Sequence, residues 1–401
     1  MPSVVWLVML AASIREDHTP LRSACGPDEP VVARLDAGAV VDIRFAITSG
    51  MPCYKVTATV HGEIRQGYVA VAAVKGKEDF ERNRMAGDAT AVQVLKPETQ
   101  IRPAAGSDAM LHKAWALIQS SQPREALELL EPAMGRLKLN PQALALAGLA
   151  AYRADNPKRA TEYWEQSLAL EANPHVEVLR ERAIREVRHD RSGDSLHGLR
   201  VTLRYEGNAL ATDVARQMIT VLDEEFSRIA GTLGCRADER VVAIVQTPAA
   251  YRASMLAAEW SGGFFDGRIH VPLLEGAKLG PATRQTFAHE LVHACLANLG
   301  RYPAWLHEGL AQRLSGEPLH PAARAAVQAA IARRALPKLE ELGQNWSGLS
   351  AEHAQMAYAL AWMAVEQLET NHGGLGLRTI LASPGLMEYK TQDLNKTLGL
   401  L

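Results

Sequence analysis

The stretch Thr283-Arg-Gln-Thr-Phe-Ala-His-Glu-Leu-Val-His-Ala-Cys-Leu-Ala297 decides how this chain of 401 residues is interpreted. It contains neither glycine nor proline, so it predicts an α-helix, which Gly300 and Pro303 end. His289 and His293 are four residues apart, which is about 40° around a helix. Both imidazoles can therefore reach one metal ion.

Two glutamates complete a predicted zinc site. Glu290 lies between the histidines and can take a proton from water as a general base. A second helix, beginning near Trp305, would return antiparallel and carry Glu308 as the third ligand that catalytic zinc usually needs. Leu296 stands where a metzincin would need glycine, which excludes that arrangement. The alternative is a surface helix with fortuitous histidines.

The second helix carries a family resemblance in Tyr302-Pro-Ala-Trp-Leu-His-Glu-Gly-Leu-Ala-Gln312. Residues 199–401 resemble peptidase MA-like metallopeptidase domains, a gluzincin group with a zincin-like α+β fold. The resemblance implies one zinc ion per chain, held by His289, His293 and Glu308, with Glu290 as the base.

One position near the site departs from the family pattern, and the roles of three other residues have alternatives. Gln312 occupies the place of an acidic residue in thermolysin-like gluzincins, so the group that orients a ligand histidine is not defined. His307 is an alternative ligand, although it points about 100° away from Glu308. Tyr358 is the candidate donor to the reaction oxyanion, with a packing role as the alternative, and His353 is a weaker candidate donor.

The rest of the C-terminal region, residues 195–401, alternates strands and helices. We expect strands at 199–205 and 241–245 and helices at 213–233, 321–334 and 353–370. Residues 264–272 predict a further strand, and the resemblance implies that backbone groups near Gly267 to Val271 bind the substrate by strand addition. His270 is expected to face solvent or the cleft.

The N-terminal region reads as short strands separated by glycine and proline. Residues 12–76 predict a small β-barrel that resembles a bacterial SH3-like domain, with strands at 31–35, 39–45, 54–60 and 66–71. Such a module would bind a peptide or cell-wall ligand, or serve a structural role. Residues 77–107 are expected to be a linker.

Residues 108–190 contain a repeat of 34 residues, the period of tetratricopeptide helix pairs. Ala126 recurs as Ala160, and Leu130 recurs as Trp164. Two pairs and a further helix predict a short solenoid, which either binds a protein partner on its concave face or acts as a spacer.

Composition limits the partners. A net charge of −2, without a basic cluster, argues against nucleic acid, and no apolar run is long enough to span a membrane. Residues 1–11 are an apolar segment that is expected to be either the remnant of a signal or the first strand of the domain that follows, and export is slightly favoured over a cytoplasmic location. Cys25 and Cys53 could form a disulfide, whereas Cys235 and Cys295 are expected to be helical and Cys295 a core residue.

The sequence therefore predicts a multidomain α+β chain: an SH3-like β-barrel, a tetratricopeptide-type solenoid and a zinc metallopeptidase domain. Its expected substrate is a peptide or protein, and endopeptidase and aminopeptidase action both remain open. The alternative is a non-catalytic scaffold that binds partners through its N-terminal half.

Overall fold

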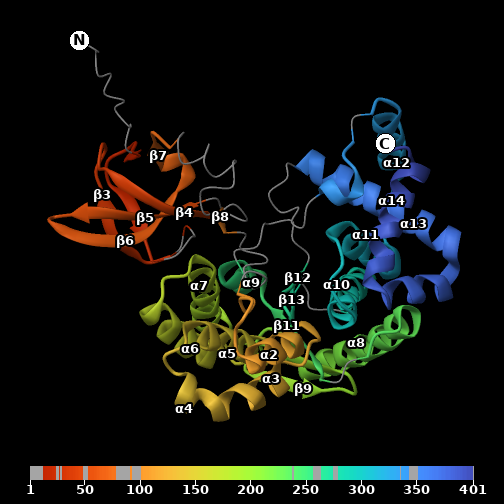
Figure 1. The fold of residues 1–401 in the computed structure, drawn as a ribbon, viewed down its shortest axis with the longest axis horizontal. Coiled ribbons are helices and arrows are strands. Elements are labelled where there is room, and N and C mark those ends of the chain that lie inside the picture. Colours follow the sequence, from red (N-terminus) through yellow and green to blue (C-terminus); the bar gives the residue numbers. More distant parts are fainter. Residues whose placement is uncertain are drawn as a thin grey trace. The chain divides into compact units, whose positions relative to one another are not determined.

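A computed structural model describes residues 12–23, 27, 29–47, 53–77, 91–92, 101–236, 239–255, 263–273, 279–334, 336–342 and 351–400. The side chains of residues 44–47, 91–92, 351–354 and 384 lie outside the description. The described residues form a mixed α+β protein (Figure 1). The chain divides into two compact units, Met1–Pro97 with Asn173–Glu181, and Glu98–Ala172 with Arg182–Leu401.

The first unit is built from antiparallel hairpins with a short hydrophobic core that includes Leu21, Tyr54 and Val56. Its strands are β1 (Ser13–Ile14), β2 (Thr19–Arg22), β3 (Val31–Leu35), β4 (Val41–Ile47), β5 (Cys53–Val60), β6 (Glu63–Ala70), β7 (Val74–Lys75) and β8 (Ala91–Val92). The larger sheet has the order β3-β2-β6-β5-β4-β8, and β1 pairs with β7. Across the described residues neither sheet closes into a barrel, and β8 lies within the predicted linker.

The second unit begins with helices that pack in pairs, as the repeat predicts. These helices are α2 (Ala109–Gln119), α3 (Pro123–Leu130), α4 (Met134–Leu137), α5 (Pro141–Arg153) and α6 (Pro157–Leu170), followed by α7 (Pro174–His189), which begins in the first unit. The repeat-related residues Ala126, Ala160, Leu130 and Trp164 are all fully buried. The period of 34 residues therefore marks the positions that form the core of the helical pairs.

A five-stranded sheet of described residues follows, in the order β12-β13-β11-β10-β9. Its strands are β9 (Asp194–His197), β10 (Val201–Tyr205), β11 (Val241–Gln246), β12 (Phe264–Phe265) and β13 (Ile269–Pro272). Helix α8 (Thr212–Leu233) packs on this sheet through Met218, Leu222 and Phe226, and α9 (Pro248–Met255) follows β11. The strands and the helix predicted between 199 and 245 are confirmed.

The single strand predicted at 264–272 is wrong. Gly267 adopts φ +106° and reverses the chain, so β12 and β13 form a hairpin. Strand β13 pairs with β11 on its other side, which leaves β12 as the edge strand of the described sheet. The prediction for His270 is also wrong, because this side chain is fully buried and lies 3.4 Å from Asp266.

The remaining helices form a C-terminal layer, which includes the two helices that carry the predicted zinc site. They are α10 (Pro281–Leu299), α11 (Ala304–Ser315), α12 (Pro321–Ala332), α13 (Ala351–Leu381) and α14 (Pro384–Leu398), and α13 is kinked at Gly373. In Figure 1, α10 and α11, drawn in teal, lie side by side, and α13, drawn in blue, packs against α11. Helix α10 ends at Gly300, as the sequence predicts.

The cysteines differ from the expectation in two respects. Cys235 was expected to be helical, but it lies in the non-helical segment after α8, which ends at Leu233. Cys295 is buried in the core as expected, but it also forms a disulfide with Cys235, 60 residues earlier. This bond ties α10 to the segment that follows α8. Cys53 is also disulfide-bonded, and its predicted partner, Cys25, lies outside the described residues.

The described helices differ from membrane-spanning segments. None of them combines the length and the apolar character needed to cross a membrane.

Candidate metal centre

Helices α10 and α11 bring the three predicted ligands together. Glu308 Oε2 lies 3.6 Å from His289 Nε2 and 3.7 Å from His293 Nε2. The ligand atoms of all three residues lie within 4.8 Å of one another, the only such grouping among the described residues. Two helices joined by the short loop before Pro303 are therefore sufficient to form the site.

The donor set fits a zinc ion. Tetrahedral zinc with ligands at about 2.0–2.1 Å places neighbouring ligand atoms about 3.4 Å apart. The distances from Glu308 to both histidines are within a few tenths of an ångström of that value. Burial disfavours the charged form of His289, but hydrogen bonds with Glu308 and Glu317 raise its pKa to about 10. The carboxylates around this imidazole therefore favour positive charge at the position that a metal would take.

Glu317 supplies the carboxylate that the Gln312 position lacks. Its Oε1 accepts a hydrogen bond from His289 Nδ1 at 3.0 Å, which leaves Nε2 for the metal. Helix α11 ends at Gly316 in the left-handed conformation, φ +82°, and the Glu317 N–H donates to the Gln312 carbonyl. This C-terminal turn carries the carboxylate back to α10. The sequence analysis missed Glu317, although a glycine after a helix is a recognisable stop signal.

Replacing Glu317 with Gln is expected to weaken zinc binding by about 10- to 100-fold, the range for partners that orient ligand histidines. Gln cannot offer the charged acceptor that fixes the Nδ1–H form of His289. Titration with a competing chelator measures the affinity. Gln312→Ala is the matched control, because the Gln312 Oε1 has no hydrogen-bond partner among the described residues. Equal affinities for wild type and Glu317→Gln would refute the orienting role.

His307 lies outside the group of candidate ligands and contacts one of them. Its Nδ1 lies 3.4 Å from His293 Nδ1, and the two rings stack with centroids 5.6 Å apart. If His293 uses Nε2 for the metal, its Nδ1 carries the hydrogen and donates to His307. The two ligand histidines thus have different partners at Nδ1, a carboxylate for His289 and an imidazole for His293.

Glu290 is buried beside this centre with an exposed fraction of 5%. Burial raises its pKa to about 7, with Glu308 and Glu317 adding to the rise and His289 opposing it. A carboxylate that titrates near neutrality suits proton transfer. Gly263, just before β12, lies over the carboxylate, because a Cβ there would be 2.5 Å from Glu290 Oε1. Only glycine allows this close approach.

Tyr358 on α13 faces the same group of carboxylates and is partly buried. The charge of Glu308, followed by burial and the charge of Glu290, raises the pKa of its phenol well above the ordinary value. The phenol therefore stays protonated and can donate a hydrogen bond. The structure brings this candidate to the metal centre, whereas the side chain of His353 lies outside the described residues.

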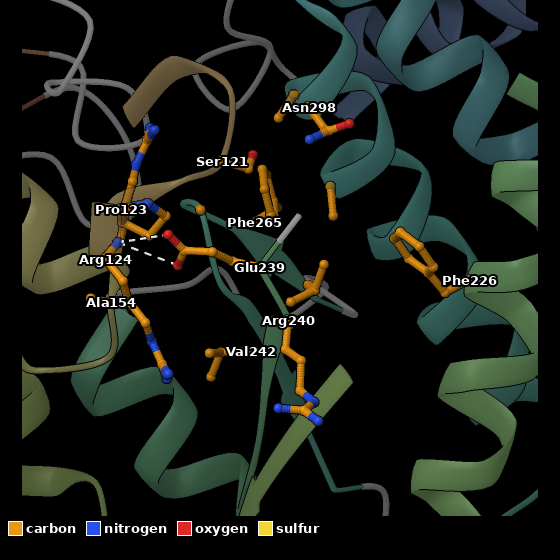
Figure 2. Close-up of a pocket in the computed structure, with 15 residues that line it drawn as sticks. Ser121, Pro123, Arg124, Ala154, Phe226, Glu239, Arg240, Val242, Phe265 and Asn298 are labelled. Atoms are coloured by element: carbon orange, nitrogen blue, oxygen red, sulfur yellow. Dashed lines mark hydrogen bonds between the residues drawn. The ribbon is translucent and has the colours of Figure 1, made fainter. Parts of the chain in front are cut away.

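A separate cavity borders α10 near its C-terminal end (Figure 2). It has a volume of about 50 Å³ and is lined by Ala294, Ala297 and Asn298 of α10, together with residues of the helical pairs and of β11. The cavity contains none of the candidate metal ligands, so the metal centre and this cavity are distinct features of the second unit.

Comparison with known proteins finds no family model, no curated protein and no solved structure that matches this chain. The geometry of the metal centre is therefore the basis for any statement about function.

Proposed function

We propose that this chain is a zinc-dependent peptidase of the gluzincin type, with one zinc ion held by His289, His293 and Glu308. The observation that supports it is the position of Glu308 Oε2, 3.6 Å from His289 Nε2 and 3.7 Å from His293 Nε2, in a group whose ligand atoms all lie within 4.8 Å of one another. Two imidazoles and one carboxylate leave a fourth position open, as in catalytic zinc sites. When bound, zinc would act as a Lewis acid and make water more acidic.

The residues around the ligands have complementary roles in this proposal. Glu290 accepts a proton from the attacking water on its carboxylate and returns it to the leaving amine. The Tyr358 phenol donates a hydrogen bond to the oxygen that becomes negative as the carbonyl is attacked. Glu317 holds His289 in the form that presents Nε2 to the metal.

An extended peptide is the substrate that the neighbouring sheet favours. Strand β12 is the edge strand of the described sheet, and Gly263 connects that edge to the general base. Backbone groups of an edge strand can pair with an extended peptide, which would bring a peptide bond toward Glu290. The edge that would pair with the peptide is therefore Phe264–Phe265. The sequence had instead favoured the backbone near residues 267–271 for this role.

The proposal also gives a domain type to each of the three regions of the chain. We infer a zincin-like domain in the C-terminal region, tetratricopeptide-type helix pairs before it and an SH3-like module at the N-terminus. The Cys235–Cys295 disulfide and the bonded Cys53 favour an oxidising compartment, and hence export.

Metal removal tests the proposed activity. Wild-type protein incubated with a peptide library is expected to release new peptide termini, and dialysis against a chelator is expected to abolish this release. Adding back one equivalent of zinc should restore the release, because the ligands remain intact. Mass spectrometry of the peptides measures the effect. Release that persists at the original rate after complete removal of metal would contradict the proposal.

A further inference from the structure

A cluster of charged side chains is buried behind the β12–β13 hairpin. Arg268, in the turn of the hairpin, is fully buried and donates two hydrogen bonds of 2.8 Å to Glu186 of α7. Glu186 is also fully buried. Burial lowers the pKa of the guanidinium, but Glu186 and Asp266 raise it well above the ordinary value. Buried charges are costly unless they are paired, so removing one partner strongly disturbs the other.

Further members of the cluster come from the hairpin, from α7 and from the segment that follows α5. Arg268 Nη1 also donates to Asp155, which follows α5, at 3.1 Å. Asp266 precedes the hairpin turn and lies 3.9 Å from Arg182 of α7. The Arg182 guanidinium lies over the ring of Phe264 in β12, 5.4 Å from its centroid. The cluster thus reaches the edge strand itself.

The hairpin turn also packs on the end of α5. The Arg268 guanidinium lies 4.0 Å from the centroid of the Tyr152 ring. A Cβ at Gly267 would be 2.7 Å from the side chain of Arg153, so the turn and the helix are in direct contact. The turn therefore has little space in which to move while the helix is in place.

The helical pairs are joined to the zinc helix as well. Asn298, near the end of α10, donates to the Ser120 carbonyl at 3.1 Å. Glu239 accepts from the backbone N–H groups of Arg124 at 2.9 Å and Glu125 at 3.1 Å, and the bonds to Arg124 are drawn in Figure 2. The helical pairs therefore contact both the zinc helix and the hairpin.

The two ends of the hairpin segment have different neighbours. The turn, at Gly267 and Arg268, is fixed by α5 and α7, whereas the start of the segment, at Gly263, lies over Glu290. Strand β12 connects these two points and carries the free edge. Any movement of the turn would shift the edge relative to the general base.

We propose that the end of α5 and the second half of α7 position the active site, with Arg268 and Glu186 as positioning residues for the β12 edge. This inference rests on the proposed peptidase function. It gives the helical pairs a role in positioning the substrate edge, in addition to any role as a spacer or as a surface that binds a partner. Glu186 and Arg268 act through the hairpin and need not contact the substrate.

Hydrogen exchange tests the positioning role without an activity assay. In Glu186→Gln, backbone amides of residues 264–271 are expected to exchange at least about tenfold faster than in wild type, because Arg268 loses the buried carboxylate that accepts both of its 2.8 Å hydrogen bonds. Amides of α10 should exchange at the wild-type rate. Glu131→Gln is the matched control, since it breaks an exposed ion pair with Arg159 inside the helical pairs.

Asp155→Asn provides a milder second variant, which decides the matter if Glu186→Gln does not fold. It weakens one contact of Arg268 and the ion pair between Asp155 and Arg204 of β10, and it leaves the Glu186 pair. A smaller acceleration in the same hairpin amides is therefore expected. Unchanged exchange of the hairpin in the folded variants, or acceleration that is equal in α10 and the hairpin, would overturn the inference.

Kinetics separate positioning from a loss of folded protein. With a peptide that wild type cleaves, Glu186→Gln is expected to raise KM at least about tenfold while zinc stays at one per chain. A fall in kcat with unchanged KM would indicate a smaller active fraction and would count against positioning. If wild type cleaves nothing, the peptidase proposal fails, and the exchange experiment still reports whether the helices hold the hairpin.

Discussion

Glu290→Gln is expected to lower the rate of peptide cleavage by at least about 100-fold and to leave one zinc ion per chain. General-base catalysis contributes about 10²- to 10⁴-fold, and Gln cannot accept the proton. Glu290 lies outside the ligand group of His289, His293 and Glu308, so the metal should remain. Gln has nearly the shape of Glu, so the packing of Gly263 over this side chain should be preserved.

The measurement compares peptides released from one extract by wild type and by the variant, together with the zinc content of both proteins. Glu366→Gln is the matched control, because its carboxylate pairs with Arg324 on the outside of α13. We expect this control to cleave at the wild-type rate. Equal cleavage by wild type and Glu290→Gln would exclude Glu290 as the base.

Glu308→Gln is expected to remove the metal itself. The amide keeps the size of the side chain but loses the negative charge that balances the cation, so affinity should fall by more than about 100-fold, beyond the range for outer partners. Cleavage should be lost in parallel. This variant and Glu290→Gln therefore predict opposite outcomes for zinc content and the same outcome for activity.

Competition with a chromogenic chelator measures that affinity. His307→Asn is a useful comparison, because His307 stacks on His293 and does not belong to the ligand group. We expect His307→Asn to retain zinc more tightly than Glu308→Gln. Wild-type affinity in Glu308→Gln would refute the assignment of the third ligand.

Local patterns predicted the helices that carry the site. The helix expected at 283–297 is observed at Pro281–Leu299, and the one expected near Trp305 begins at Ala304. The i, i+4 spacing determines where the histidines point once the segment is helical. A short loop then returns Glu308 to them. These features depend on neighbours in the sequence, and for that reason they could be inferred from it.

Contacts between distant segments could not be inferred in this way. Glu317 reaches His289 through the turn at Gly316, whose direction depends on the packing of α11. The Cys235–Cys295 disulfide spans 60 residues, and no spacing motif marks it. The pair between Glu186 and Arg268 is separated by 82 residues and forms only when α7 packs behind the hairpin.

The barrel was predicted from short, partly alternating β-branched segments separated by glycine or proline and from a resemblance to SH3-like domains, and residues 264–272 were predicted as one continuous strand. Alternation identifies strands but does not state which edges pair, so an open sheet and a closed barrel have the same pattern. At the hairpin, the turn Asp266-Gly267-Arg268 is short, and its neighbours on both sides have high β propensity. Because strand-forming residues continue on both sides of this turn, the sequence pattern did not indicate the chain reversal that makes Phe264–Phe265 the edge strand.

The zinc content of the purified, zinc-replete protein tests the central claim most directly. Elemental analysis of wild type after removal of loosely bound metal should give about one zinc ion per chain, and Glu308→Gln should give far less under the same conditions. Wild-type protein that is folded and holds no zinc would contradict the assignment of His289, His293 and Glu308 as a metal centre.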